Sequence, residues 1–188
     1  LAFDRSFGES FFRQNERADM PIEISRDVFR LAQVFTISRG SRTEAQVLTT
    51  CISEGNVWGR GECVPYARYG ETLDSVTAEI EGLPDAFTRA ELYDLLPAGA
   101  ARNAVDCALW DLEAKQTGKR VWELAGLATP GPEITAYTLS LDTPENMQAQ
   151  AAVHAYRPLL KIKLGTPDDM PRLEAVRAGA PGARIIVD

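Results

Sequence analysis

The sequence predicts an α+β domain followed by a parallel β/α unit, and three observations lead to this fold class. Strand-like segments separated by turns come first, over residues 22–62. Segments with helical spacing follow, over residues 72–127. After Thr129-Pro130-Gly131-Pro132, strand-like and helix-like segments alternate with short loops, which is the pattern of a parallel βαβαβ unit.

Composition narrows the class of protein before any motif is considered. The chain has 188 residues, 45% of them hydrophobic, and a formal net charge of −7. An acidic chain without a long basic run argues against nucleic acid or an anionic membrane as the main partner. Neither a membrane span nor a signal peptide is expected, because charged residues interrupt the apolar segments. Three irregularly spaced cysteines, Cys51, Cys63 and Cys107, predict reduced thiols and a cytoplasmic protein.

The first half is expected to begin with an antiparallel meander. Residues 1–19 show no clear period and are interpreted as an extension or arm. A turn-rich loop is expected at Thr36–Thr43, and Gly59-x-Gly61 is interpreted as a turn, because no βαβ unit follows it as a nucleotide-binding loop would require. The expected strands cover Ile22–Phe35, Ala45–Ser53 and Asn56–Glu62.

Helices are expected to follow the meander. The longest is predicted at Ala100–Thr117, where apolar residues follow helical spacing and Gly118 stands at the C-cap position. Thr88 and Glu91 have the spacing of a capping box and predict a helix that ends before Pro97. A further helix is expected at Thr72–Glu81.

The second half is predicted to be the parallel unit, with Thr143 as an N-cap. Because the sequence stops at a strand end and three parallel strands leave an open edge, we interpret it as the N-terminal part of a longer protein. The predicted domains are an extension at 1–19, an α+β domain at 20–128 and an incomplete β/α unit at 129–188. The expected strands and helices are Ile134–Leu141, Pro144–Tyr156, Leu159–Leu164, Asp168–Ala178 and Arg184–Asp188.

The segment Lys161-Ile162-Lys163 is the strongest chemical signal. In a strand, Lys161 and Lys163 share one face while Leu160, Ile162 and Leu164 share the other. If the lysine face points into the protein, repulsion and desolvation favour the neutral form of at least one amine, which then serves as a base near neutral pH. From spacing alone, an edge strand with a solvated lysine face is an equal alternative.

Five segments, taken in order, resemble the enolase superfamily in its muconate-lactonizing subgroup, and within it most resemble the L-Ala-D/L-Glu (dipeptide) epimerases. They are Ile37–Ala45, Gly61–Glu71, Leu96–Leu112, Leu160–Leu164 and Ile185–Asp188. The resemblance implies an α+β capping domain followed by the first strands and helices of a (β/α) TIM-like barrel, here truncated. It also implies that Lys163 is a catalytic acid/base, that Lys161 assists it and neutralises the substrate carboxylate, and that Asp188 is the first of three carboxylate ligands to Mg²⁺.

The activity implied by the resemblance is that of an isomerase of cell-wall peptide turnover. It is the Mg²⁺-dependent epimerisation of an L-Ala-D/L-Glu-type dipeptide by 1,1-proton transfer through an enediolate. The remaining metal ligands and the lysine on the opposite face of the substrate lie beyond this sequence. The alternatives are a cycloisomerase or o-succinylbenzoate synthase of the same superfamily, or a catalytically inactive fragment. The full-length protein is expected to form a homo-oligomer.

Two segments, Thr36–Glu44 and Val64–Glu71, correspond to the segments that cover the barrel mouth and select the substrate in the family. Arg39 aligns with an arginine that some members use against a substrate carboxylate, and Arg42 is the competing candidate. Either guanidinium would bind an anionic side chain in a bidentate manner, although loop arginines are also commonly solvated. Tyr66 and Arg68 are the substrate-binding candidates of the second segment.

Overall fold

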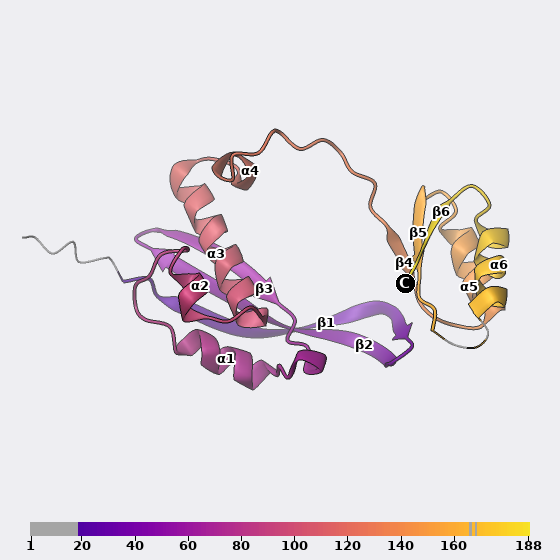
Figure 1. The fold of residues 1–188 in the computed structure, drawn as a ribbon, viewed down its shortest axis with the longest axis horizontal. Helices are drawn as coiled ribbons and strands as arrows, with labels where there is room; N and C mark the ends of the chain where they lie inside the picture. The colour runs from indigo at the N-terminus through magenta and orange to yellow at the C-terminus, as the bar shows by residue number, and fades with distance from the viewer. Residues whose placement is uncertain (1–18, 166, 168) are drawn as a thin grey trace, which may run out of the picture. The chain divides into compact units, whose positions relative to one another are not determined.

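The computed structural model describes residues 19–165, 167 and 169–188, and these form two compact units (Figure 1). One unit combines the residues up to Ser25 with Leu48–Gly118, and the other combines Arg26–Val47 with Lys119–Asp188. Each unit has its own hydrophobic core. The predicted extension at 1–19 lies, except for Asp19, outside the described residues, and the domain boundary expected after residue 128 stays a prediction.

The antiparallel sheet consists of β1 (Ile22–Ile37), β2 (Gly40–Glu54) and β3 (Val57–Cys63), in the order β1-β2-β3. The prediction of a loop over Thr36–Thr43 is wrong. Both strands continue through this segment, and the turn between them takes only Ser38 and Arg39. The polar side chains of this segment are mostly exposed, so the two strand ends lack the apolar alternation from which a strand is predicted.

Strand β3 packs against the long helix α3 (Ala100–Thr117), which has the predicted bounds and ends at Gly118 with a φ of 67°. Gly59 and Gly61 lie within β3, so their interpretation as a turn is also wrong. A Cβ at Gly59 would lie 2.0 Å from the carbonyl oxygen of Ala108, and one at Gly61 would lie 1.9 Å from that of Ala104. These glycines therefore allow the backbone of α3 to approach the strand closely.

The remaining helices of this region agree broadly with expectation. Thr72 caps α1 by accepting a hydrogen bond from the backbone of Ser75. The capping box of Thr88 and Glu91 forms, but the helix that follows it is a single short turn. The elements are η1 (Ala67–Tyr69), α1 (Leu73–Glu81), α2 (Leu92–Leu95) and α4 (Val121–Leu124).

The second unit contains the predicted βαβαβ arrangement, with three parallel strands in the order β4-β5-β6. Its core is formed by Leu139, Leu160, Ile162 and residues of the two helices, which include Met147 and Val176. Its elements are β4 (Tyr137–Leu139), α5 (Pro144–Val153), β5 (Leu159–Ile162), α6 (Asp169–Gly179) and β6 (Arg184–Val187). The strands are shorter than predicted, and the unit has the architecture of the opening of a β/α barrel.

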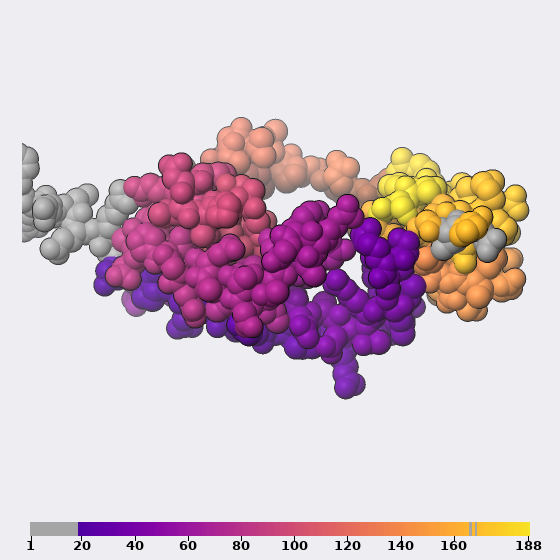
Figure 2. All heavy atoms as spheres, turned by 60° about the horizontal axis from the view of Figure 1, so that its bottom comes forward, coloured from indigo at the N-terminus to yellow at the C-terminus, as the bar shows by residue number. Residues whose placement is uncertain are grey.

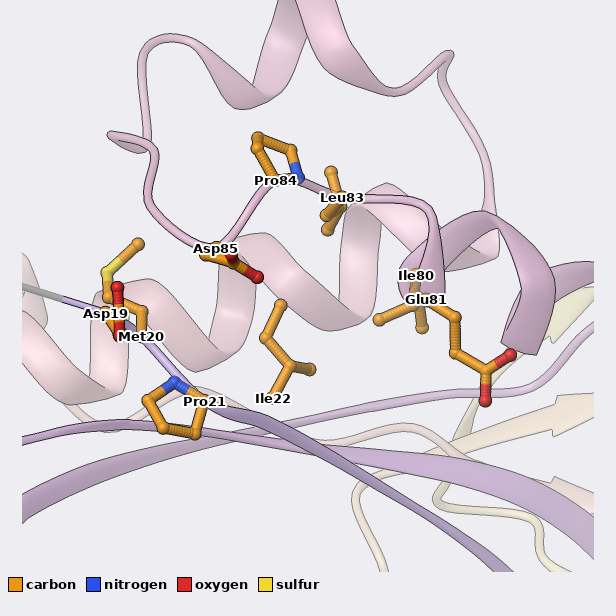
Figure 3. A pocket seen from close by; sticks show the side chains of 9 residues that line it. All are labelled: Asp19, Met20, Pro21, Ile22, Ile80, Glu81, Leu83, Pro84 and Asp85. Atoms are coloured by element: carbon orange, nitrogen blue, oxygen red, sulfur yellow. The ribbon is translucent and has the colours of Figure 1, made fainter.

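A hollow of about 460 Å³ lies in the first unit, where the start of β1 meets the segment after α1 (Figure 3). Apolar side chains of Met20, Ile22, Ile80 and Leu83 line it together with Asp85. None of the site residues expected from the sequence lines this hollow.

Among the described residues, no helix is long and apolar enough to cross a membrane.

Candidate active site

The register of the parallel sheet brings Lys163 and Asp188 together. Ile162 pairs with Val187, and the ladder continues one step further, because Asp188 N–H donates to the Ile162 carbonyl at 3.0 Å. Leu164 N–H in turn donates to the Asp188 carbonyl at 2.9 Å. Lys163 and Asp188 therefore stand side by side at the carboxyl ends of β5 and β6, which is the catalytic end of a β/α barrel.

Both lysines contact one carboxylate oxygen. The Lys163 Nζ lies 2.5 Å from Asp188 Oδ2, and the Lys161 Nζ contacts the same atom. The predicted alternation is confirmed, since Leu160 and Ile162 are fully buried on the other face. The side chains of Lys161 and Lys163 are 33% and 22% exposed. Strand β5 lies between β4 and β6, so the alternative of an edge strand is wrong.

The lysines determine the protonation of Asp188. Hydrogen bonds from Lys161 and then from Lys163 lower the pKa of this carboxyl to about 2, and their positive charges act in the same direction. Asp188 is consequently a carboxylate at every physiological pH. A charged carboxylate is a hard oxygen ligand of the kind Mg²⁺ prefers, so Asp188 fits the role of one metal ligand. Within the described residues no group of three or more His, Cys, Asp or Glu side chains gathers that could hold a metal ion.

The tip of the β1–β2 hairpin lies at the same end of the parallel sheet. Residues 26–47 belong to the same compact unit as β4–β6 (Figure 2). Thr36 N–H donates to Ser140 Oγ at 2.8 Å, and Leu141 N–H donates to the Thr36 carbonyl at 3.0 Å. Arg39 occupies the turn of this hairpin and Arg42 lies on β2. The unit thus combines the first predicted recognition segment with the lysine–aspartate cluster.

Tyr66 and Arg68 belong to the other unit, where Tyr66 stands just before the short helix η1 and Arg68 lies within it. Glu71 holds this segment: its Oε2 accepts from Tyr66 N–H at 2.9 Å and its Oε1 accepts from Ala100 N–H at 2.7 Å. The carboxylate thereby satisfies a backbone donor at the start of α3, where negative charge is favourable. The Tyr66 and Tyr69 rings pack against each other, with their centroids 5.7 Å apart. The sequence contains no signal for the Glu71 bridge, since its partners become neighbours only on folding.

Cys63 ends β3 and is buried, so we expect it to be unreactive. Burial, followed by the charges of Glu71 and Glu62, raises the pKa of the Cys63 thiol to about 11. Because only the thiolate reacts, iodoacetamide at pH 8 should label the exposed Cys107 well before Cys63 in the folded chain. Peptide mass spectrometry after timed quenching measures the two rates. Equal labelling in the folded chain, without urea, would contradict this assignment.

Comparison with known proteins identifies the family. Residues 20–126 match the mandelate racemase / muconate lactonizing enzyme N-terminal domain. The chain is 42% identical to the L-Ala-D/L-Glu epimerase of Escherichia coli, over 89% of this chain and 54% of that protein. An enolase family member from Agrobacterium tumefaciens, described as homologous to dipeptide epimerases and bound to L-Ala-L-Glu, is 54% identical with a TM-score of 0.85, over 89% of this chain and 52% of that one.

A more distant neighbour extends the comparison to a metal complex. The dipeptide epimerase of Enterococcus faecalis, complexed with Mg and L-Leu-L-Tyr, matches with a TM-score of 0.80 at 25% identity, over 90% of this chain and 53% of that one. The chain spans about half the length of the curated relatives it matches. It belongs to the mandelate racemase / muconate lactonizing enzyme family of the enolase superfamily, with the family's N-terminal domain followed by the opening of the β/α barrel.

Proposed function

We propose that this chain supplies the first half of a dipeptide epimerase active site that acts on L-Ala-D/L-Glu-type substrates. The observation that carries the proposal is the contact of Lys161 and Lys163 with Asp188 at the carboxyl ends of β5 and β6. The names of the similar proteins support the substrate class. A homo-oligomeric assembly, a cytoplasmic location and a place in cell-wall peptide turnover remain expectations from the sequence.

In this proposal Lys163 moves the proton. Its amine takes the proton from the carbon next to the substrate carboxylate, and an acid on the opposite face returns a proton with inversion. Lys161 adds a positive charge beside Lys163, which attracts the substrate carboxylate. Both amines reach Asp188 Oδ2 because Lys161 and Lys163 are two positions apart and therefore lie on the same face of β5.

Asp188 would contribute one oxygen ligand to Mg²⁺. When bound, the metal ion supplies Lewis-acid stabilisation of the negative charge that develops on the substrate carboxylate. The low pKa of Asp188 keeps this ligand deprotonated without competition from protons at neutral pH.

Arg39 is the proposed contact for an acidic side chain of the dipeptide, with Arg42 as the competing candidate. Arg39 lies in the hairpin turn, and the strand before this turn is hydrogen-bonded to the end of β4. A guanidinium there would bind a glutamate carboxylate through two parallel hydrogen bonds. Tyr66 and Arg68 are proposed to add contacts from the second recognition segment.

The test completes the barrel by fusing this chain, after Asp188, to the second half of the Agrobacterium relative. The fused enzyme is expected to epimerise L-Ala-L-Glu in the presence of Mg²⁺ and, in D₂O, to incorporate deuterium at the α-carbon. The chain alone should show no turnover, because half of the site is missing. Turnover of a muconate or a succinylbenzoate precursor without dipeptide epimerisation would favour the cycloisomerase or synthase alternative and contradict the proposal.

A further inference from the structure

We propose that Ser140 is a positioning residue that holds the tip of the β1–β2 hairpin on the barrel opening, and so helps to select acidic dipeptides. The hairpin tip is defined here as Thr36–Ser41. The inference rests on the proposed function for its effect on selectivity. Its structural part, the attachment of the tip, is tested independently below.

Ser140 and Leu141 hold both backbone groups of Thr36. Ser140 is 5% exposed, and its Oγ accepts from Thr36 N–H at 2.8 Å. The next residue, Leu141, donates its N–H to the Thr36 carbonyl at 3.0 Å. A buried hydroxyl that accepts from a backbone amide makes a specific contact, because loss of the oxygen leaves that amide without its acceptor.

The attachment extends across the tip. Thr36 Oγ1 and Ser41 Oγ lie 2.9 Å apart, so a restraint on Thr36 is passed to the strand on the other side of the turn. At the end of β5 the chain passes through Gly165, whose φ is +123°. A Cβ on Gly165 would lie 3.1 Å from the Ser38 Cβ, which shows how closely the turn approaches this strand end. The tip therefore lies against the residues that follow β4 and close to Gly165, which follows β5.

This arrangement separates recognition from proton transfer. Lys163 and Asp188 are held by the β5–β6 ladder and do not depend on Ser140. Arg39 lies within the tip, and its position follows that of Thr36 and Ser41. Release of the tip should therefore weaken the binding of an acidic side chain and leave the chemical step in place.

The first measurement uses the chain as it is and needs no activity. In Ser140→Ala, amide hydrogen exchange of Thr36 and Leu141 should become about tenfold faster, as expected for the loss of one hydrogen bond. Ser140→Thr keeps the hydroxyl and should restore protection. Thr143→Ala is the matched control: it removes a side-chain acceptor of similar type, which receives the Asn146 N–H at 3.3 Å in the same unit. It should leave the exchange of the tip unchanged. Unaltered protection of Thr36 in Ser140→Ala would overturn the proposal.

The second measurement uses the fused enzyme. Ser140→Ala should raise KM for L-Ala-L-Glu by about tenfold and change kcat by less than about twofold, with recovery in Ser140→Thr. A loss confined to kcat would overturn the role in selectivity. If even the unmodified fusion fails to epimerise dipeptides, the proposed function fails, while hydrogen exchange still decides whether Ser140 holds the tip.

Discussion

Replacement of Lys163 by methionine should lower epimerisation of L-Ala-L-Glu by the fused enzyme by at least about 1,000-fold, since a positioned general base contributes factors of this order. Methionine keeps the length and the apolar stem of the side chain while removing the amine. The contacts of Leu160 and Ile162 with the core lie on the opposite strand face and should survive the change. The loss would therefore report chemistry and not folding.

Isotope exchange makes the prediction sharper. If lysines act on opposite faces of the α-carbon, Lys163→Met should still exchange the α-proton of the one epimer whose proton faces the remaining lysine. Proton NMR in D₂O follows both epimers separately. The matched control is Lys119→Met, an exposed lysine before α4, which should retain full activity. Undiminished epimerisation by Lys163→Met would exclude Lys163 as the base.

Replacement of Gly61 by alanine should destabilise the first unit by about 3 kcal/mol or more, toward the upper end of overpacking effects. The added Cβ would meet the Ala104 carbonyl oxygen at 1.9 Å and the Ala108 nitrogen at 2.8 Å. Both atoms belong to the backbone of α3 and cannot rotate away as a side chain would. The helix must move off β3, and the apolar contacts between them are then lost.

Urea unfolding followed by circular dichroism measures this loss, and faster labelling of Cys63 under native conditions reports it locally, because Cys63 belongs to the same core. Gly59→Ala should behave similarly. Gly131→Ala is the control, since a Cβ there has no neighbour within 4 Å. An unchanged urea midpoint for Gly61→Ala would show that β3 and α3 do not pack as described.

The elements that the sequence predicts well are those with a strong local pattern. Helix α3 combines helical spacing over its whole length with a glycine at its end, and its bounds match. Strand β5 shows alternation that the structure reproduces. The end of the hairpin, Thr36–Thr43, is predicted as a loop from the sequence because the backbone pairing of these strand ends needs no apolar face. Gly59 and Gly61 suggest a turn by local rule, and only the approach of a distant helix explains them.

The candidate site divides in the same way. Two lysines on one strand face follow from the spacing in the sequence, and an aspartate at the end of the third strand follows from the family resemblance. Their meeting at one oxygen depends on the register between β5 and β6, which is a tertiary property. The hydrogen bond between Thr36 and Ser140 joins residues that are 104 positions apart, so no local sequence pattern predicts it.

By itself, the sequence determined most of the helices and strands, which strand face carries amines, and to which family the chain is similar. These properties are encoded in neighbouring residues, whose periodicity and capping act over a few positions. Only the tertiary structure shows where the hairpin tip is attached, that Gly59 and Gly61 make room for the backbone of α3, and that the two lysines share the carboxylate of Asp188. Such contacts join distant segments, and they form only when burial of the two cores brings those segments together.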